Sequence, residues 1–318
     1  MLPSRTVVGM LSVGLLVLGA GVVSGQDYPN RPIRIVTSAV GGGTDFAARI
    51  MAQGLAARLG QPVIVDNRPA LAQGVIVPKA PPDGYTLLVG GESLWISVFF
   101  EKMPHDPVRD FAPVTYALTS PNVLVVIPSL PVKSVKDLID LAKARKGDLD
   151  YGTGSNGSSA HLAGELFKSM TGVSMVRIPH NGTGAMINSL LNGQVPLAFS
   201  NVTAGTPHIK SGKLRGVAVT SSKPSALLPG LPTVAESLPG YKFVGDVVLL
   251  APPGTSAPII ARLHRETVQV LNTAEVKEKL LNAGFEVEGG SPQELGAWIK
   301  SETARWGKVI KEAGLRAN

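Results

Sequence analysis

The 318-residue sequence contains no cysteine, and aromatic residues make up only 5% of it. The absence of cysteine excludes disulfides, thiol catalysis, zinc–thiolate sites and lipid attachment through a cysteine. Without disulfides the fold must rest on its hydrophobic core, which a chain of this length can form. Apolar residues make up 44% and charged residues 17%, so the composition is that of a folded protein with room for two domains.

Long basic runs are also missing. The formal net charge is +7, but the lysines and arginines are scattered, with no run of five and no interleaved aromatic residues. This pattern indicates an ordinary basic surface and argues against nucleic-acid binding. A positive surface of this kind would mildly steer small anions toward the protein.

Motifs of familiar enzymes and metal sites are absent as well. The chain has no Gly-x-Ser-x-Gly elbow and no Walker pattern, and its five histidines have no metal-ligand spacing. Ser158, Ser159 and His161 are close in sequence, but residues two apart on a helix do not face each other. We therefore expect no catalytic site, no metal and no cofactor.

The first 25 residues read as a secretory signal peptide. A continuous apolar stretch at 7–23 follows Arg5, and small residues at 23–25 offer a cleavage site. The alternative is an uncleaved membrane anchor, but the stretch is shorter than the ~20 residues that a bilayer needs, and Gly14, Gly19 and Gly21 weaken it as a span. We expect export and cleavage.

Strand-like and helix-like segments alternate along the rest of the chain. This alternation favours βαβ units and parallel sheet. A strand, a glycine-rich turn and a helix occur in this order twice, at 36–50 and 151–167, which suggests two α/β lobes with a ligand cleft between them. Capping boxes at Ser134 and Ser291 mark the starts of two helices. Strands are expected at 33–38, 63–67, 85–90, 111–118, 123–127, 149–153, 175–180, 196–200 and 243–252, and helices at 41–60 after its glycine turn, 134–147, 158–170, 182–192, 257–272, 274–284 and 291–314.

The second glycine turn, at 152–157, has the Gly-x-Gly-x-x-Gly spacing of a dinucleotide-binding fingerprint. That fingerprint needs an acidic residue about 20 positions on. The sequence offers Arg177 and His180 there, and no carboxylate stands between 172 and 191. An arginine would suit a 2′-phosphate, but export argues against a nicotinamide cofactor. The glycine spacing is therefore interpreted as incidental.

Both glycine turns, "GGGTDF" and "GTGSNGSS", leave backbone N–H groups free at a helix N-terminus. These donors and the positive end of the helix dipole suit a carboxylate or a phosphate. The hydroxyl groups of Thr44, Ser155, Ser158 and Ser159 add further hydrogen bonds. Ordinary capping without a ligand is the alternative for either turn alone, but two such turns in one exported chain favour a binding site.

Several segments, in order, resemble the Bug family, the extracytoplasmic solute receptors of tripartite tricarboxylate transporters. The segments are "YPNRPIRIVTSAVGGGTDFAARIMAQGLAARLGQPVIVDNRP", "APPDGYTLLVG", "HDPVRDFAPVT", "YGTGSNGSSAHLAGELFKSMTGV" and "HIKSGKLRGVAVTSSKPSALLPGLPTVAES". The resemblance implies a two-lobed periplasmic-binding-protein fold (type II-like), each lobe a mostly parallel sheet flanked by helices. It places lobe I at 26–120 and 245–318, and lobe II at 121–244.

The resemblance also implies a function. We expect a monomeric, non-enzymatic receptor in the periplasm that captures a small carboxylate by hinge closure and delivers it to a membrane permease. A ligand sensor for a two-component system is the alternative, and an exported enzyme with a cleft active site is a weaker one. Carried over by position, the expected ligand contacts are Gly42, Gly43, Thr44, Asp45, Ser93, Ser155, Gly157, Ser158, Ser159, His161, Thr183, Gly184, Asn201 and Asp246.

The sequence departs from the family pattern at three places. "ALAQGVIVPKA" follows "NRP" in place of a longer glycine-rich run. "GGESLWISVFF" replaces a turn rich in Thr, Gly and His, so that Glu92, Ser93 and Trp95 stand where ligand contacts are expected. Asp246 stands where family members often carry tryptophan. Glu92 or Asp246 would either select an amino group on the ligand or be solvated or salt-bridged, and the second interpretation is the plainer one.

Overall fold

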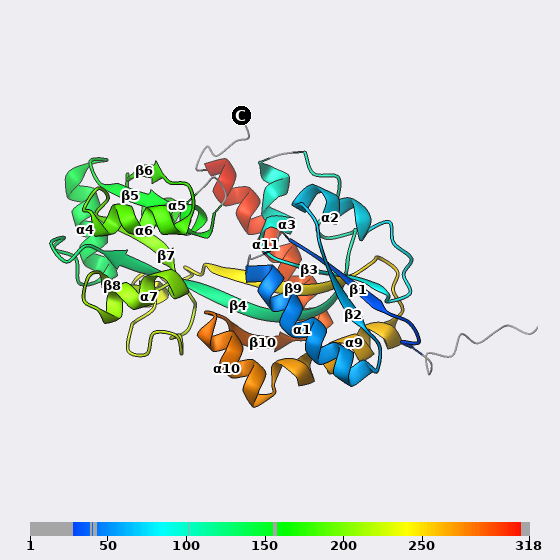
Figure 1. Cartoon of the computed structure of the whole chain (residues 1–318). Coiled ribbons are helices and arrows are strands. Elements are labelled where there is room, and N and C mark those ends of the chain that lie inside the picture. The colour runs from blue at the N-terminus through cyan, green and yellow to red at the C-terminus, as the bar shows by residue number, and fades with distance from the viewer. Residues whose placement is uncertain (1–27, 39, 41–42, 101, 155–157, 313–318) are drawn as a thin grey trace, which may run out of the picture.

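A computed structural model describes residues 28–38, 40, 43–100, 102–154 and 158–312. The expected signal peptide lies outside the described residues, as do Gly42, Ser155 and Gly157. No helix in the described ranges is long and apolar enough to cross a membrane. The chain forms a two-lobed α/β structure whose lobes lie to the right and left in Figure 1.

The elements follow one another as the sequence predicts, with several short additions. The strands are β1 (Ile33–Thr37), β2 (Val63–Asn67), β3 (Thr86–Gly90), β4 (Ala112–Val126), β5 (Asp150–Thr153), β6 (Val176–Pro179), β7 (Leu197–Asn201), β8 (Arg215–Val219), β9 (Val244–Ala251) and β10 (Glu286–Gly290). The helices are α1 (Gly43–Leu59), α2 (Ala70–Ile76), α3 (Ser93–Ile96), η1 (Ser97–Phe99), α4 (Val135–Arg145), α5 (Ser159–Thr171), α6 (Thr183–Leu191), α7 (Val202–Lys210), α8 (Val234–Ser237), α9 (Ala257–Leu271), α10 (Ala274–Asn282) and α11 (Pro292–Glu312).

Each lobe contains one sheet, and both sheets are mixed rather than mostly parallel. In the first, β2, β1 and β3 are parallel, while β9, β4 and β10 continue the sheet in antiparallel pairs. In the second, β6, β5 and β7 are parallel, and β4 runs antiparallel to β7 and β8. The parallel expectation is thus confirmed for the βαβ portions alone. It fails at the strands beside β4, because this strand enters both sheets.

Strand β4 joins the two sheets. The sequence predicted two strands, at 111–118 and 123–127, and this prediction is wrong because the residues between them stay extended. The first part of β4 pairs with β9 as far as Pro121, which lies opposite Val244, and from Asn122 onward the strand pairs with β7 and β8. Proline has no N–H to donate to a ladder, so it suits the point where the partners change. Figure 1 shows β4 running from one lobe into the other.

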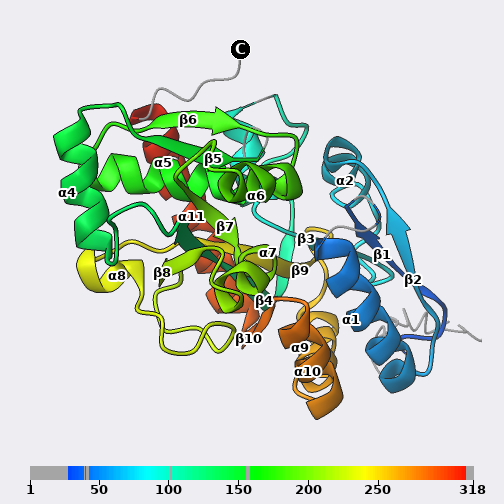
Figure 2. The ribbon, with the colours of Figure 1, turned by 60° about the vertical axis from the view of Figure 1, so that its left-hand side comes forward.

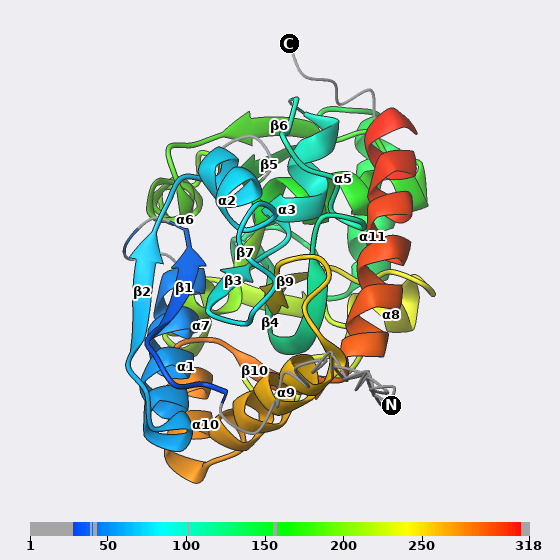
Figure 3. The same ribbon diagram turned by 90° about the vertical axis from the view of Figure 1, so that its right-hand side faces the viewer.

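Helices cover both faces of the first sheet. Alternate residues of β9 point to opposite faces. Val247 and Leu249 pack with α1 and α9, whereas Val248 and Leu250 pack with α11. In Figure 3, α11 runs along one side of the sheet, and α1, α9 and α10 lie toward the other. In the second lobe, α5, α6 and α7 pack around β5, β7 and β8 (Figure 2).

The predicted helix starts are confirmed in detail. The Ser134 hydroxyl accepts from the N–H of Asp137, and the Asp137 carboxylate accepts from the Ser134 N–H, which completes a capping box for α4. The same reciprocal bonds join Ser291 and Glu294 at the start of α11. These bonds satisfy donors that the first turn of a helix otherwise leaves unpaired.

Candidate functional site

A cavity of about 330 Å³ lies where the two sheets meet. Its wall comes from the ends of β3 and β7, the middle of β4, the start of β9 and the N-termini of α1 and α5. The lining residues are Ser38, Gly43, Thr44, Gly91, Glu92, Ser93, Ser120, Asn122, Ser159, Asn201, Gly245, Asp246, Val247 and Phe285.

Two larger hollows lie elsewhere on the surface. One, of about 580 Å³, is lined by apolar residues of α2 and by 102–104. The other, of about 750 Å³, is lined mainly by 98–110. Both are lined by first-lobe residues alone, so movement of the second lobe would not enclose a ligand in them. The cavity between the sheets is therefore the better candidate.

The N-terminus of α1 forms one side of this cavity. Gly43 and Thr44 both line it, and the Thr44 hydroxyl is hydrogen-bonded to that of Ser38. A side chain at Gly43 would place its Cβ 3.0 Å from the ring of Phe285, so glycine allows the close approach of these segments. The positive end of the dipole of this 17-residue helix thus faces the cavity.

Asp45, in the same turn, has a structural role instead. Its carboxylate is almost fully buried, accepts a hydrogen bond of 2.8 Å from Asn67, and forms an ion pair of 3.0 Å with Arg49. The predicted ligand contact at Asp45 is not among the cavity residues, because the side chain turns back to hold the start of α1 against β2.

The N-terminus of α5 contributes from the second lobe. Ser158 is the N-cap and accepts from the N–H of His161 at 3.4 Å, whereas Ser159, the first residue of the helix, lines the cavity. The two helices α1 and α5 thus reach the cavity from different sheets. Figure 2 shows α1 and α5 in separate lobes.

His161 lies behind this turn rather than in the cavity, and it is 2% exposed. The pKa of its imidazole is lowered to about 4. Burial is the main cause, and the positive charge of the nearby Arg177 guanidinium also contributes. Both causes disfavour a second proton on the ring. A neutral His161 packs under the α5 N-terminus and adds no positive charge to the site.

This pKa predicts how stability depends on pH. Histidine in the unfolded chain titrates near 6.5, so the unfolded state takes up the proton first as the pH falls. The contribution of His161 to the free energy of unfolding is therefore present above about pH 6.5 and is lost as the pH falls toward about 4. We expect His161→Gln to flatten the decline of the urea midpoint between pH 6.5 and 4. Equal slopes for variant and parent would contradict the buried neutral histidine.

Two other predicted contacts, Thr183 and Gly184, are exposed at the start of α6 and do not line the cavity. Asn201 does line it. Its side-chain oxygen accepts a hydrogen bond from the N–H of Thr203 at 2.9 Å, and its side-chain NH₂ group donates to the Ser120 hydroxyl at 3.2 Å. Asn201 therefore caps α7 and ties it to the middle of β4.

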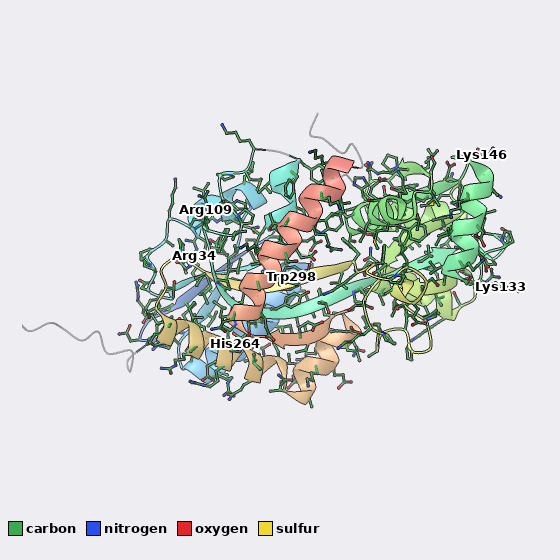
Figure 4. All side chains as sticks on the ribbon, turned by 180° about the vertical axis from the view of Figure 1, so that it is seen from behind. Arg34, Arg109, Lys133, Lys146, His264 and Trp298 are labelled. Atoms are coloured by element: carbon green, nitrogen blue, oxygen red, sulfur yellow. The ribbon has the colours of Figure 1, made fainter. Side chains whose placement is uncertain are left out.

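Two carboxyl groups, Glu92 and Asp246, stand at the junction of the lobes. Glu92 is half-buried, and one of its oxygens accepts from the Asp246 N–H at 3.3 Å. The Asp246 carboxyl is buried and accepts from the Tyr116 hydroxyl. Tyr116 in turn stacks on Trp298 of α11, with ring centroids 4.9 Å apart; Figure 4 labels Trp298. Within the described ranges neither carboxyl group forms a salt bridge, so the salt-bridged interpretation is not what the structure shows.

Burial raises the pKa of both groups. For Glu92, desolvation dominates over hydrogen bonds from backbone N–H groups, which lower the pKa. For Asp246, desolvation is again the main cause, and the neighbouring carboxylates of Glu92 and Glu302 raise the pKa further. A buried carboxyl group beside other acids favours its neutral form. Glu92, which is half-buried, is the more accessible of the two.

The cavity contains six of the fourteen residues predicted from sequence, and three others lie outside the described residues. The six are Gly43, Thr44, Ser93, Ser159, Asn201 and Asp246. The remaining five, Asp45, Ser158, His161, Thr183 and Gly184, are placed outside the lining.

Sequence reasoning did not assign several lining residues, among them Asn122 and Phe285. Asn122 follows Ser120 and Pro121, a polar interruption of an apolar run that could have marked a position facing a site. Phe285 precedes β10 and reaches the cavity from far along the chain, and nothing in its local sequence signals this. Glu92 stands where the family pattern places ligand contacts, and it lines the cavity, but it is not one of the fourteen predicted contacts.

The lining is rich in hydroxyl and amide groups and has no residue arrangement for metal binding. Across the described ranges, no group of three or more His, Asp or Glu could hold a metal ion. Of the lining residues that the structure describes, Glu92 and Asp246 alone are titratable. The arrangement suits noncovalent binding of a small polar molecule by backbone N–H groups, hydroxyls and one accessible carboxyl group.

The fold and the position of this cavity define a class, the two-lobed solute-binding proteins. The sequence model of the family described as "Tripartite tricarboxylate transporter family receptor" matches residues 47–315. The chain belongs to this family and is a Bug-type receptor. It is 38% identical to the protein BugT of Bordetella pertussis, over 96% of this chain and 97% of that protein.

Solved structures agree. The chain is similar to R. palustris Rpa4515 with adipate, at 38% identity and a TM-score of 0.73, over 91% of this chain and 99% of the other. It is similar to MatC from Rhodopseudomonas palustris with bound malate, at 28% identity and a TM-score of 0.69, over 89% and 100%. A TctC solute-binding protein from Polaromonas with no ligand gives a TM-score of 0.81 at 26% identity, over 90% and 99%.

Proposed function

We propose that the protein is a periplasmic receptor that captures a small carboxylate between its lobes and delivers it to a membrane permease of the tripartite type. The observation that carries this proposal is the cavity at the lobe junction, where the N-termini of α1 and α5 meet from opposite sheets. Backbone N–H groups at the positive ends of two helices are suited to a carboxylate. Adipate and malate, bound by two of the similar proteins, are both small dicarboxylates.

The same proposal includes hinge closure. We assign lobe I to 26–120 and 245–318, and lobe II to 121–244. The two points where the chain passes between these lobes are neighbours, because Ser120 pairs with Gly245 and Pro121 with Val244. Paired crossings of this kind allow one lobe to turn relative to the other with few backbone changes. A ligand that contacts both lobes binds the closed form better and so drives closure.

The proposal includes an open arrangement of the lobes before the ligand binds. The chain superposes better on the ligand-free Polaromonas protein than on the adipate-bound protein, although its sequence is closer to the latter. If the lobes of this chain are open, as we propose for the ligand-free state, its TM-score should be higher against a ligand-free protein than against a ligand-bound one. The contacts proposed for the carboxylate are the α1 turn at Gly43 and Thr44 and the α5 turn at Ser159, with Gly42, Ser155 and Gly157 as further predicted members.

A thermal-shift screen of residues 26–318 tests the ligand class. Each carboxylate is paired with an uncharged analogue of the same length, such as adipate with 1,6-hexanediol. A ligand at 100 times its Kd stabilises the folded state by about 2.7 kcal/mol, which corresponds to a rise in Tm of roughly 5–10 °C. Mass spectrometry of the released ligand should show it chemically unchanged. A folded protein that no carboxylate or amino acid stabilises would contradict the proposal.

A further inference from the structure

The charges around the cavity are of one sign. Among the described residues, the lining includes the carboxyl groups of Glu92 and Asp246 but no lysine, arginine or histidine. None of residues 39, 41–42 and 155–157, which lie outside the described ranges, is basic. The helix N-termini can hold one carboxylate. A second carboxylate at the Glu92 end would meet another acid, because Lys242 and Arg305, which share a separate small hollow with Glu92, Asp246 and Glu302, do not line this cavity.

Glu92 lines the cavity and is half-buried. It rests over the backbone at the start of β9, with one oxygen 3.3 Å from the Asp246 N–H. Gly245, beside it, has no side chain, and a Cβ built there would still lie 4.0 Å from the same Glu92 oxygen. A small group of a ligand can therefore approach this oxygen across the bare glycine. The Asp246 carboxyl group is occupied differently, because it accepts the Tyr116 hydroxyl on the side of α11.

A second acceptor belongs to a lining residue on β4. Asn122 lines the cavity and is fully buried, and its amide nitrogen donates to the Phe199 carbonyl at 3.0 Å. This bond fixes which atom of the amide is the oxygen. That oxygen, Oδ1, is buried and has no hydrogen-bond partner among the described residues. Buried polar atoms are nearly always paired, so an unpaired acceptor at a ligand cavity indicates that the ligand supplies a donor.

We infer that the ligand carries a primary ammonium group as well as a carboxylate, and that Glu92 and the Oδ1 atom of Asn122 bind the ammonium while the α1 and α5 N-termini bind the carboxylate. The inference rests on the proposed function and narrows its substrate class from small carboxylates to aminocarboxylates. An ammonium group has donors and no acceptor, which matches two acceptors on residues that line the same cavity. Glu92 is then the residue that selects an aminocarboxylate over a dicarboxylate.

Calorimetric titration with matched ligand pairs tests the inference. The pairs are succinate with 4-aminobutanoate, glutarate with 5-aminopentanoate, and adipate with 6-aminohexanoate, so that only the terminal group changes. Aspartate and glutamate add the α-amino arrangement. We expect at least one aminocarboxylate to bind 10-fold or more tightly than its dicarboxylate counterpart. We also expect its affinity to rise with pH as Glu92 ionises, in a range above that of an ordinary glutamate, because burial raises the pKa of that group.

Two variants test whether Glu92 is the residue that selects an aminocarboxylate over a dicarboxylate. Glu92→Gln should remove the preference and weaken the aminocarboxylate at least 10-fold, while Glu278→Gln, an exposed acid on α10, makes the same charge change and should leave the affinity within two-fold. If dicarboxylates bind more tightly than every amino counterpart, or bind more tightly as the pH falls, the inference is wrong and the proposed function stands. If neither series binds to folded protein, the proposed function itself fails. The comparison of ligand pairs on the parent protein decides the matter even if the Glu92 variant does not fold.

Discussion

The substitution Ser159→Asp is expected to abolish carboxylate binding and to leave the fold at least as stable. Ser159 is the first residue of α5 and lines the cavity. A carboxylate in the first turn of a helix interacts favourably with the helix dipole, by about 0.3–1 kcal/mol at exposed sites. In the cavity the same group repels the ligand carboxylate and competes for its N–H donors. We expect a loss of affinity of at least 100-fold, or about 2.7 kcal/mol.

The matched control is Thr183→Asp. Thr183 is likewise the first residue of a helix, α6, but it is exposed and lies outside the cavity lining. The affinity of this variant for the carboxylate should stay within about two-fold of the affinity of the parent protein. Calorimetric titration and thermal unfolding of both variants give the two quantities separately. Normal binding by Ser159→Asp would exclude the α5 turn as a carboxylate site, and an equal loss in Thr183→Asp would place the ligand against α6 as well.

The contrast between Ser159 and Thr183 shows what local sequence can and cannot specify. Each residue follows a glycine-containing turn and begins a helix, and both were predicted as ligand contacts. The helix start depends on residues three or four positions away, and so it is legible in the sequence, as the capping boxes at Ser134 and Ser291 confirm. Whether a helix start faces the cavity depends on where its lobe docks. That placement is fixed by packing between distant segments.

The sheets show the same limit. The parallel βαβ portions follow from alternating strands and helices, but the antiparallel pairs depend on β4 passing through both lobes. Nothing local distinguishes an extended residue at Ser120 or Pro121 from one in a loop, which is why one strand was predicted as two. Asn122 and Phe285 enter the cavity through these long-range pairings. Glu92 was noticeable because it departs from the family pattern, but its burial and its contact with β9 required the structure.

Trp306→Ala is the substitution expected to destabilise the fold most. Trp306 of α11 is 2% exposed and meets the ring of Phe243 edge to face, with centroids 5.7 Å apart and planes at 89°. Its indole N–H donates to Glu302 at 3.2 Å. Replacing a buried tryptophan by alanine typically costs about 3–5 kcal/mol, because the neighbours do not fill the cavity that remains. We expect a fall in Tm of roughly 6–12 °C, with a matching fall in the urea midpoint.

Trp306→Phe separates the ring contact from the hydrogen bond. It keeps an aromatic ring against Phe243 and loses the N–H to Glu302, so it should cost about 1–2 kcal/mol. Phe243 directly precedes β9, and its N–H donates to the Thr220 carbonyl at the end of β8, so this ring packs on the segment that returns from lobe II to lobe I. If that segment is part of the hinge, Trp306→Ala should also loosen the return crossing. Hydrogen exchange should then rise at residues 243–246 more than at the β1–β3 strands, whereas a uniform rise would mean that Trp306 stabilises the core without holding the hinge.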